Sequence, residues 1–476
     1  MTVNKKIINT DFCVVGAGSG GLSFAAGCVQ MGGSVVLLEK GKMGGDCLNY
    51  GCVPSKSLIY ASKFANEIKK SINVGWNNNK ISKVDFKKVH DHIHNVISKI
   101  EPHDSVERFE SLGVNVIKEE GFFLDENHVE TKSYIIKAKR FIISTGSSPF
   151  IPNINGLDLV PFYTNENIFD LTELPEHLVV IGGGPIGIEL ASAFNRLGSK
   201  ATVLSASKIL PKDDVEITSL LKAKLIGEGI DIHENIKINN VSKEGDLCRV
   251  DYECEDGNGL EIKSSHLLIA TGRKPNITSL NLHKAGINFS EKGICVGKNL
   301  KTSNPKVYAI GDCIGGYQFT HVAGYHAGIA IRNSIFHLGA KIQTHAIPWV
   351  TYTDPEIAHV GVTEQQISDN NYKILKMNFS DNDRAQTECK TEGMIKVIVT
   401  KKGKILGATI FGPSAGELIY PWVIAMQNNM NISVIASSIA PYPTLSEINK
   451  RVAGQFYTEK LYGSFMNKIV KFIMRL

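Results

Sequence analysis

The sequence predicts an α/β protein with two Rossmann-like dinucleotide-binding motifs followed by a smaller α+β region. Two stretches predict the motifs, because residues 12–28 and 178–197 each read as an apolar strand, a glycine-rich turn and a helix. The pattern changes after His345, where strands within 396–411 precede a helical stretch at 416–428. A length of 476 residues is consistent with about three domains.

The composition is that of a globular protein with a full core. Hydrophobic residues make up 43% and charged residues 21% of the chain, and a net charge of only +5 predicts no nucleic-acid partner. No apolar run approaches the ~20 residues of a membrane span. Residues 1–10 are polar and lack a signal-peptide core. We therefore expect a cytoplasmic protein, in which a cysteine pair is more often catalytic than structural.

The first dinucleotide motif contains the groups that a pyrophosphate and a ribose require. Its turn reads G-x-G-x-x-G at Gly16, Gly18 and Gly21. These glycines allow a tight turn and a close approach of the pyrophosphate to a helix N-terminus. The following strand ends at Glu39, whose carboxylate can accept both hydroxyls of an adenosine ribose. Strand, turn, helix and acid together favour a dinucleotide site over a glycine turn without a ligand.

The second motif repeats the glycine pattern at Gly182, Gly184 and Gly187. Two such motifs in one chain predict two dinucleotides. The second has no acid at the end of its second strand, where the chain reads Leu-Ser-Ala-Ser-Lys from Leu204, with Ser205 first after the strand. A hydroxyl or a cation at this position favours a 2′-phosphate, so the sequence favours NADPH over NADH.

Three further turns are suited to contact with a bound dinucleotide. Two strands end in small residues, which let the backbone approach a ligand closely. One ends in Ser-Thr-Gly, with Thr145 and Gly146, and the other ends in Ala-Thr-Gly, with Gly272. A third apolar strand ends in Gly-Asp at Asp312, a carboxylate placed to bind a polyol chain.

The stretch around which these motifs are arranged is residues 44–56, which contains Cys47 and Cys52 between glycines. Cysteines at this spacing are a redox pair, a metal pair or unrelated buried residues. A zinc site needs a second ligand pair. The next cysteines, Cys248 and Cys254, are far away in the sequence and have no histidines at a suitable spacing. We favour a redox-active disulfide and predict no metal site.

The C-terminal stretch 463–476 has the pattern of an amphipathic helix. Apolar residues lie on one side of the predicted helix and the basic residues Lys468, Lys471 and Arg475 on the other. Residues 456–476 carry +3 of the net +5. The pattern is typical of a membrane-surface helix, but a terminal helix docked on its own domain or on a partner subunit has the same pattern.

Taken in order, these motifs resemble the flavin-dependent pyridine nucleotide–disulfide oxidoreductases. The resemblance spans nearly the whole chain. It implies an FAD domain at 1–155 and 280–344, an NAD(P) domain at 156–279 and an interface domain at 345–476 that forms a homodimer with shared active sites. Within the family, the chain resembles mercuric reductase-like and dihydrolipoyl dehydrogenase-like proteins.

The resemblance also implies a route for the electrons. A hydride passes from the nicotinamide to the flavin, and the electrons then reach Cys52, the sulfur expected nearest the ring. The disulfide opens and releases Cys47 as the thiolate that meets the acceptor. Lys56 places positive charge near the flavin and pairs with a glutamate that matches Glu189.

One position departs from most of the family. Disulfide reductases and dihydrolipoyl dehydrogenases have a histidine five residues before a glutamate, which here is Glu447, and this histidine moves the thiol proton. The present chain has Tyr442, and a phenol with an ordinary pKa of about 10 is a poor base at neutral pH. Mercuric reductase also has a tyrosine here, but its C-terminal cysteine pair is absent, since the last cysteine is Cys389.

We therefore expect an FAD-dependent NAD(P)H oxidoreductase that reduces a metal ion or a small disulfide through the Cys47–Cys52 pair. Dihydrolipoyl dehydrogenase is the first alternative. A redox-linked, membrane-associated partner protein is the second, supported only by the basic stretch 463–476.

Overall fold

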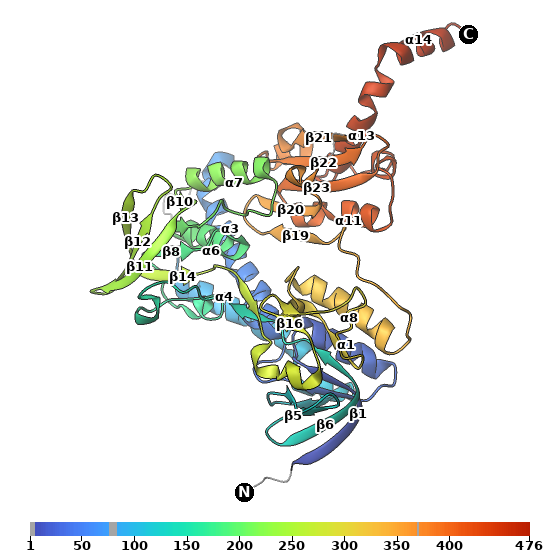
Figure 1. Ribbon diagram of the computed structural model, residues 1–476. Helices are drawn as coiled ribbons and strands as arrows, with labels where there is room; N and C mark the ends of the chain where they lie inside the picture. The colour runs from blue at the N-terminus through green and yellow to red at the C-terminus, as the bar shows by residue number, and fades with distance from the viewer. Residues whose placement is uncertain (1–4, 76–82, 369–370) are drawn as a thin grey trace. The chain divides into compact units, whose positions relative to one another are not determined.

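The computed structural model describes residues 5–75, 83–368 and 371–476 (Figure 1). The chain forms two compact units. Unit 1 comprises Met1–Gly182, Ala193–Leu204 and Ile236–Ile342. Unit 2 comprises Gly183–Ser192, Ser205–Asn235 and Gln343–Leu476. Of the predicted polar N-terminus, residues 1–4 lie outside the described residues.

The main sheet of unit 1 has the strand order β3-β2-β1-β6-β5-β4, and β18 pairs with β6. Its parallel strands are β1 (Lys6–Val15), β2 (Val35–Leu38), β3 (Asn115–Ile117), β6 (Tyr134–Ile143) and β18 (Val307–Ala309). Strands β4 (Phe122–Phe123) and β5 (His128–Glu130) add an antiparallel edge. The last four residues of β1 are buried, which explains why they read as an unbroken apolar run.

The helices of unit 1 connect these strands. They are α1 (Ser19–Gln30), α2 (Gly45–Asn49), α3 (Cys52–Lys70), α4 (Phe86–Ile100), α5 (Val106–Ser111) and α8 (Thr320–Ser334). Helix α1 packs against α8. Because the parallel strands all end at the same edge of the sheet, the turns after β1, β2, β6 and β18 come together there. Apart from Lys56, which lies on α3, the residues predicted to hold the first dinucleotide follow these four strands.

Unit 1 also contains a second parallel arrangement, in which β8 (His177–Ile181) pairs with β9 (Lys200–Leu204) and β14 (His266–Ile269). An antiparallel sheet consists of β11 (Lys237–Glu244), β12 (Leu247–Glu253) and β13 (Gly259–Ser264). Two short pairs join β7 (Ser147–Pro149) to β15 (Arg273–Pro275) and β16 (Phe289–Ser290) to β17 (Gly293–Ile294). Helix α6 (Pro185–Leu197) follows β8, as the second glycine motif predicts.

Unit 2 is built on an antiparallel sheet of order β19-β20-β23-β22-β21. The strands are β19 (Pro348–Thr351), β20 (Glu356–Gly361), β21 (Tyr372–Asn378), β22 (Met394–Thr400) and β23 (Ile405–Gly412). The helices are α7 (Val215–Gly227), α9 (Asp383–Thr387), α10 (Ala415–Leu418), α11 (Tyr420–Gln427), α12 (Ser433–Ala436), α13 (Glu447–Leu461) and α14 (Ser464–Ile473), with a short strand β10 (Asp231–His233). The predicted α/β and α+β classes are confirmed.

The helical stretch predicted at 416–428 is divided in two. Helix α10 ends at Leu418, and α11 begins at Tyr420 with Pro421 in its first turn. Proline is tolerated in a first turn but not in a helix interior, so the sequence contains the reason for the break. Trp422 is fully buried in the core of this unit, and its indole N–H donates to Asn449 Oδ1 at 2.8 Å.

Buried ion pairs connect α7 to the sheet of unit 2. Lys396, on β22, is 1% exposed, and its Nζ lies 2.9 Å from Asp214 Oδ2 and 3.0 Å from Glu216 Oε2. Glu364 forms a third ion pair with the same ammonium group. Asp214 is itself 1% exposed and accepts from the backbone N–H of Glu216 and Ile217, so it also caps the start of α7.

We predict that Lys396→Met lowers the free energy of unfolding of unit 2 by about 3–5 kcal/mol. The substitution would leave the Asp214 carboxylate buried without its cation. Urea unfolding followed by tryptophan fluorescence measures the change. Lys376→Met is the matched control, because Lys376 also pairs with Glu216 but is 42% exposed and should cost less than about 1 kcal/mol. Equal losses for the two variants would contradict the prediction.

Candidate active site

The two predicted redox cysteines lie together at the junction of two helices in unit 1. Cys47 lies within α2, and Cys52 is the first residue of α3. Both are free thiols, and they are hydrogen-bonded to each other. The left-handed backbone at Gly44 (φ 82°) and Gly45 (φ 59°) permits the turn that begins α2. The structure therefore brings together the pair that the spacing predicted.

The pKa values of the two thiols are shifted in opposite directions. The hydrogen bond from Cys47 lowers the pKa of Cys52 to about 6, and a hydrogen bond from Thr320 and the positive charge of Lys56 act in the same direction, against the effect of burial. The Cys52 side chain also lies at the N-terminus of α3, where partial positive charge favours a thiolate. The same hydrogen bond and burial raise the pKa of Cys47. The two shifts favour a thiolate at Cys52 and a protonated thiol at Cys47.

A frame of polar residues holds the loop that carries Cys47. Asp46 Oδ1 lies 3.0 Å from an Arg273 guanidinium nitrogen and accepts from Asn165 Nδ2 at 3.1 Å. The same amide donates to the Tyr50 carbonyl at 3.1 Å, so Asn165 bridges residues on either side of Cys47. Three residues of this site, Asn165, Arg273 and Thr320, were not predicted from the sequence. No motif marks Asn165, whereas Arg273 follows a turn that was identified and Thr320 begins α8.

The first glycine motif forms a cradle that excludes side chains. Gly16 has φ 104°, and a Cβ there would lie 2.5 Å from the Ser144 carbonyl oxygen. A Cβ on Gly21 would lie 1.9 Å from the Gly16 carbonyl oxygen, and Gly18 faces Gly45 without a side chain between them. Helix α1 has Gly18 as its N-cap, no side-chain cap and no acid in its first turn. Its N-terminal N–H groups are therefore available to a pyrophosphate.

The carboxylates predicted to hold the same dinucleotide lie at the same sheet edge. Glu39, after β2, accepts from the Ala17 N–H at 2.7 Å and the Gly41 N–H at 2.6 Å, which fixes it beside the glycine turn. Asp312, after β18, accepts from Ser147 Oγ at 2.7 Å, and burial raises its pKa. An acid beside the glycine turn and a second, half-buried acid fit a ligand rich in hydroxyl groups.

The remaining predicted residues of this site form the turn after β6. Thr145 Oγ1 donates to the Asn276 carbonyl at 2.7 Å, and the Asn276 N–H donates to the Gly146 carbonyl at 3.0 Å. Gly146 has φ 69°, and no heavy atom lies within 4 Å of the position that a Cβ would take there, so the backbone is open on that side. These features fit a dinucleotide lying along the sheet edge.

The second glycine motif has the same local construction. Gly182 has φ 124°, and a Cβ there would lie 2.2 Å from the Ala270 carbonyl oxygen. Gly184 and Gly272 have no heavy atom within 4 Å of a Cβ position, and Gly187 lies within α6. Ser205 is buried at 3% exposure, so the exposed hydroxyl and cation of this turn belong to the residues that follow, Ser207 and Lys208.

The remaining predicted catalytic residues lie in unit 2. Glu189, on α6, is 5% exposed and accepts from the Tyr352 N–H at 2.9 Å. Its pairing with Lys56 stays a prediction. Tyr442 is 69% exposed, and its hydroxyl donates to Asp383 Oδ2 at 2.8 Å, which raises the pKa of the phenol. Glu447 is the first residue of α13.

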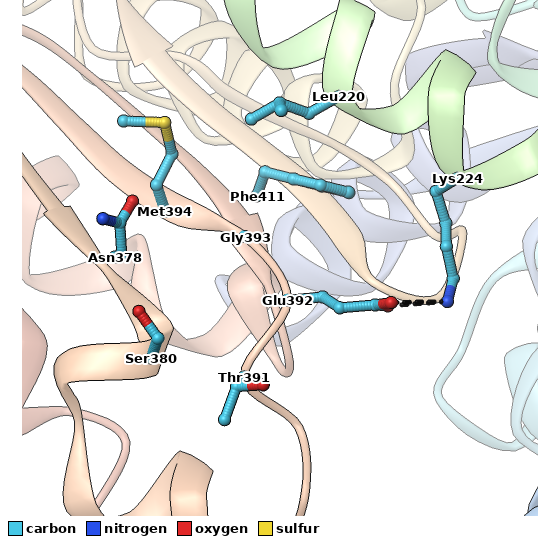
Figure 2. A pocket seen from close by; sticks show the side chains of 9 residues that line it. All are labelled: Leu220, Lys224, Asn378, Ser380, Thr391, Glu392, Gly393, Met394 and Phe411. Atoms are coloured by element: carbon cyan, nitrogen blue, oxygen red, sulfur yellow. Dashed lines mark hydrogen bonds and ion pairs between the residues drawn. The ribbon is translucent and has the colours of Figure 1, made fainter.

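A separate pocket of ≈ 410 Å³ lies within unit 2. Leu220 and Lys224 on α7 line it, together with Met394 and Phe411 on the sheet, and Figure 2 shows the ion pair between Lys224 and Glu392 beside it. The pocket includes none of the predicted catalytic residues. We assign the chemistry to the thiol pair, where an activated nucleophile is present.

We predict that iodoacetamide modifies Cys52 of the reduced protein with a pH midpoint near 6, because only the thiolate reacts. The rate should be high above pH 6 and fall as the pH drops below it. Mass spectrometry of the peptides that contain Cys47 and Cys52 measures each site separately. Thr320→Val should raise the midpoint, since it removes a hydrogen bond to the Cys52 sulfur. Preferential modification of Cys47 at neutral pH would contradict the assignment.

Comparison with known proteins identifies the family. Residues 10–327 match the pyridine nucleotide-disulphide oxidoreductase family, and residues 347–453 match its dimerisation domain, which supports a homodimer. The chain is 36% identical to mercuric reductase from Bacillus cereus, over 92% of this chain and 70% of that protein. It is 35% identical to dihydrolipoyl dehydrogenase from Geobacillus stearothermophilus, over 95% and 97% of the two chains.

Solved structures agree with this assignment. The Cu(II) complex of the HOCl-induced flavoprotein disulfide reductase RclA from Escherichia coli superimposes with a TM-score of 0.83 and 26% identity, over 93% of this chain and 99% of that one. The chain therefore belongs to the pyridine nucleotide-disulphide oxidoreductase family and is an FAD-containing, NAD(P)H-dependent oxidoreductase.

Proposed function

We propose that this oxidoreductase reduces a thiophilic metal ion bound by the Cys47 and Cys52 sulfurs. When bound, FAD supplies the two-electron chemistry that connects NAD(P)H to the sulfur pair. The glycine cradle at Gly16, Gly18 and Gly21 would hold its pyrophosphate, and Glu39 its adenosine ribose. Asp312 would bind the polyol chain, and Thr145 and Gly146 would lie along it.

The thiol pair has the chemistry that this proposal requires. Two thiolates bind a soft divalent ion, with loss of the thiol protons. Two electrons from NAD(P)H then reduce the ion to the metal, which leaves, and NAD(P)⁺ and a proton are the other products. The low pKa of Cys52 supplies one thiolate at neutral pH, and binding of the ion at Cys52 would promote loss of the proton from Cys47.

The observation that carries the proposal is the environment of Tyr442. Its hydroxyl donates to Asp383, and this hydrogen bond raises the phenol pKa, so the side chain is a hydrogen-bond donor and not a base at neutral pH. Reduction of a disulfide requires protons to be delivered to the product thiols. Reduction of a metal ion adds only electrons to the acceptor, so it needs no proton donor for the product. In the homodimer, Tyr442 and Glu447 of the partner subunit would complete each site.

The names of relatives support the same class of acceptor. Two of the proteins compared are a mercuric reductase and a flavoprotein disulfide reductase solved with Cu(II). Both metals favour sulfur ligands over oxygen ligands in at least one oxidation state. Mercuric ion, which takes two electrons to become the metal, is therefore the acceptor to test first. Cupric ion is the second, and one NAD(P)H would reduce two cupric ions to cuprous ions, the state that sulfur ligands favour.

Dihydrolipoyl dehydrogenase is the alternative that a specific observation favours. That relative aligns over 97% of its own length, compared with 70% for the mercuric reductase. In this alternative, Glu447 and water would replace the missing histidine. Rapid lipoamide-dependent turnover of NADH would favour it, and a rate near background would exclude it. The nucleotide stays a prediction, in which Ser207 and Lys208 favour NADPH.

We predict that Cys47→Ser lowers acceptor reduction by more than about 1,000-fold and leaves reduction of the flavin by NAD(P)H intact. The substitution removes one sulfur ligand but no group of the glycine cradle. Steady-state NAD(P)H oxidation with Hg(II) measures the first effect, and stopped-flow absorbance measures the second. Cys389→Ser is the matched control, because Cys389 is an exposed cysteine outside the thiol pair. Loss of FAD from Cys47→Ser would show that Cys47 is structural.

We also predict that Tyr442→His raises turnover of a dithiol or disulfide substrate by about 10- to 100-fold, since it introduces a base that titrates near neutral pH. Metal-ion reduction should not rise. Tyr442→Phe removes the hydroxyl without adding a base, so it should leave disulfide turnover low. Unchanged disulfide turnover in Tyr442→His would mean that Tyr442 does not occupy the acid–base position.

A further inference from the structure

We propose that helix α14 (Ser464–Ile473) binds the surface of an anionic lipid bilayer. The helix follows α13, and Figure 1 shows it projecting from the five-stranded sheet of unit 2. The match to the family's dimerisation domain ends at residue 453. Helix α14 is therefore an addition to the part of the chain that carries the oxidoreductase activity, and the proposal does not depend on which acceptor is reduced.

The apolar side of α14 is exposed. None of its residues is buried, and the side chains of Phe465, Phe472 and Ile473 are 74%, 66% and 59% exposed. A terminal helix that packs on its own domain buries an apolar stripe. Helix α14 has the apolar residues for such a stripe, but none of them is buried within unit 2.

The charges of α14 are arranged for an anionic surface. With about 100° between successive residues, Phe465, Ile469, Phe472 and Ile473 share one side of the helix. The cations Lys468, Lys471 and Arg475 lie together on a neighbouring side, roughly 110° around the helix, with two neutral polar residues. The chain has no acid between residues 461 and 476. A protein partner would need an apolar groove bounded by acids, whereas an anionic bilayer offers apolar chains and negative headgroups to any helix of this kind.

The dimensions of α14 decide how it would bind. A ten-residue helix is about 15 Å long, half the thickness of a bilayer core. In the part of the chain that the structure describes, no helix combines the length and hydropathy needed to cross a bilayer. The helix would therefore lie in the plane of the interface, with Phe465 and Phe472 among the acyl chains and the cations at the headgroups.

The test is co-sedimentation of the full-length holoprotein with vesicles of phosphatidylcholine alone or with 30% phosphatidylserine. We expect binding to the anionic vesicles that weakens as salt rises and little binding to the neutral ones. Each cation near the surface contributes about fivefold to partitioning, so Lys468→Gln/Lys471→Gln/Arg475→Gln should lower it roughly 100-fold. Phe465→Ser/Phe472→Ser keeps all three charges and should also abolish binding.

The matched control is Lys401→Gln/Lys402→Gln/Lys404→Gln, which removes the same net charge from exposed lysines at the turn between β22 and β23. This variant should bind like the unchanged protein. Equal losses in the two triple variants would show binding by net charge alone and would overturn the proposal.

Two other outcomes would overturn it. One is absence of binding to the anionic vesicles at low salt. The other is a change of oligomeric state on deletion of residues 463–476, measured by sedimentation velocity, because the helix would then be buried against a second copy of the chain. NAD(P)H oxidation with Hg(II) should be the same in all these variants. The membrane proposal can therefore fail without any change in the evidence for the acceptor.

Discussion

The chemistry of the candidate site depends on the interaction between the Cys47 and Cys52 sulfurs. A thiol pair in water would have two similar acidities, and neither member would be a thiolate at neutral pH. Here the interaction lowers the pKa of Cys52 to about 6 and raises the pKa of Cys47, which favours a thiolate at Cys52 and a thiol at Cys47. Three neighbouring features favour this charge distribution: the start of α3, the Thr320 hydroxyl and the Lys56 ammonium group. The reduced pair can therefore supply one nucleophile and one proton donor.

The fold of unit 1 serves to bring this pair to a dinucleotide. Parallel strands end at one edge, and the turns after them supply a side-chain-free cradle, two carboxylates and a small-residue loop. This edge is also connected to the thiol loop, because β7, which follows β6, pairs with β15, and Arg273 at the start of β15 reaches Asp46 beside Cys47. A substitution in this frame would therefore alter both the position of Cys47 and the electrostatic environment of Asp312, which lies 4.0 Å from Arg273. Unit 2 carries the dimerisation domain and Tyr442, whose hydroxyl donates to Asp383.

Much of this arrangement could be predicted from the sequence, because glycine motifs, apolar strands and paired cysteines are local patterns. The cradle at Gly16 and the Cys47–Cys52 pair are examples, and both depend on residues close together in the chain. Asn165 and Thr320 could not be predicted, because each meets the thiol loop across more than a hundred residues and no periodicity encodes such a contact. Ser205 shows a different limit. The sequence places it directly after the second strand of the motif, but only the folded turn shows that its side chain is buried against Gly183.

The most direct test of the central claim is an anaerobic titration of the purified holoprotein with NADPH, and separately with NADH, followed by visible absorbance. We predict a long-wavelength charge-transfer band from the Cys52 thiolate to the flavin at two-electron reduction. Because the Cys52 pKa is about 6, the band should be full above that pH and disappear as the pH falls below it. Cys52→Ser should lack the band. Cys47→Ser should show it before NAD(P)H is added and lose it on reduction, because without a disulfide the electrons stay on the flavin. Bleaching of the flavin without such a band would contradict the account, since the sulfur pair would then not be in electronic contact with the ring.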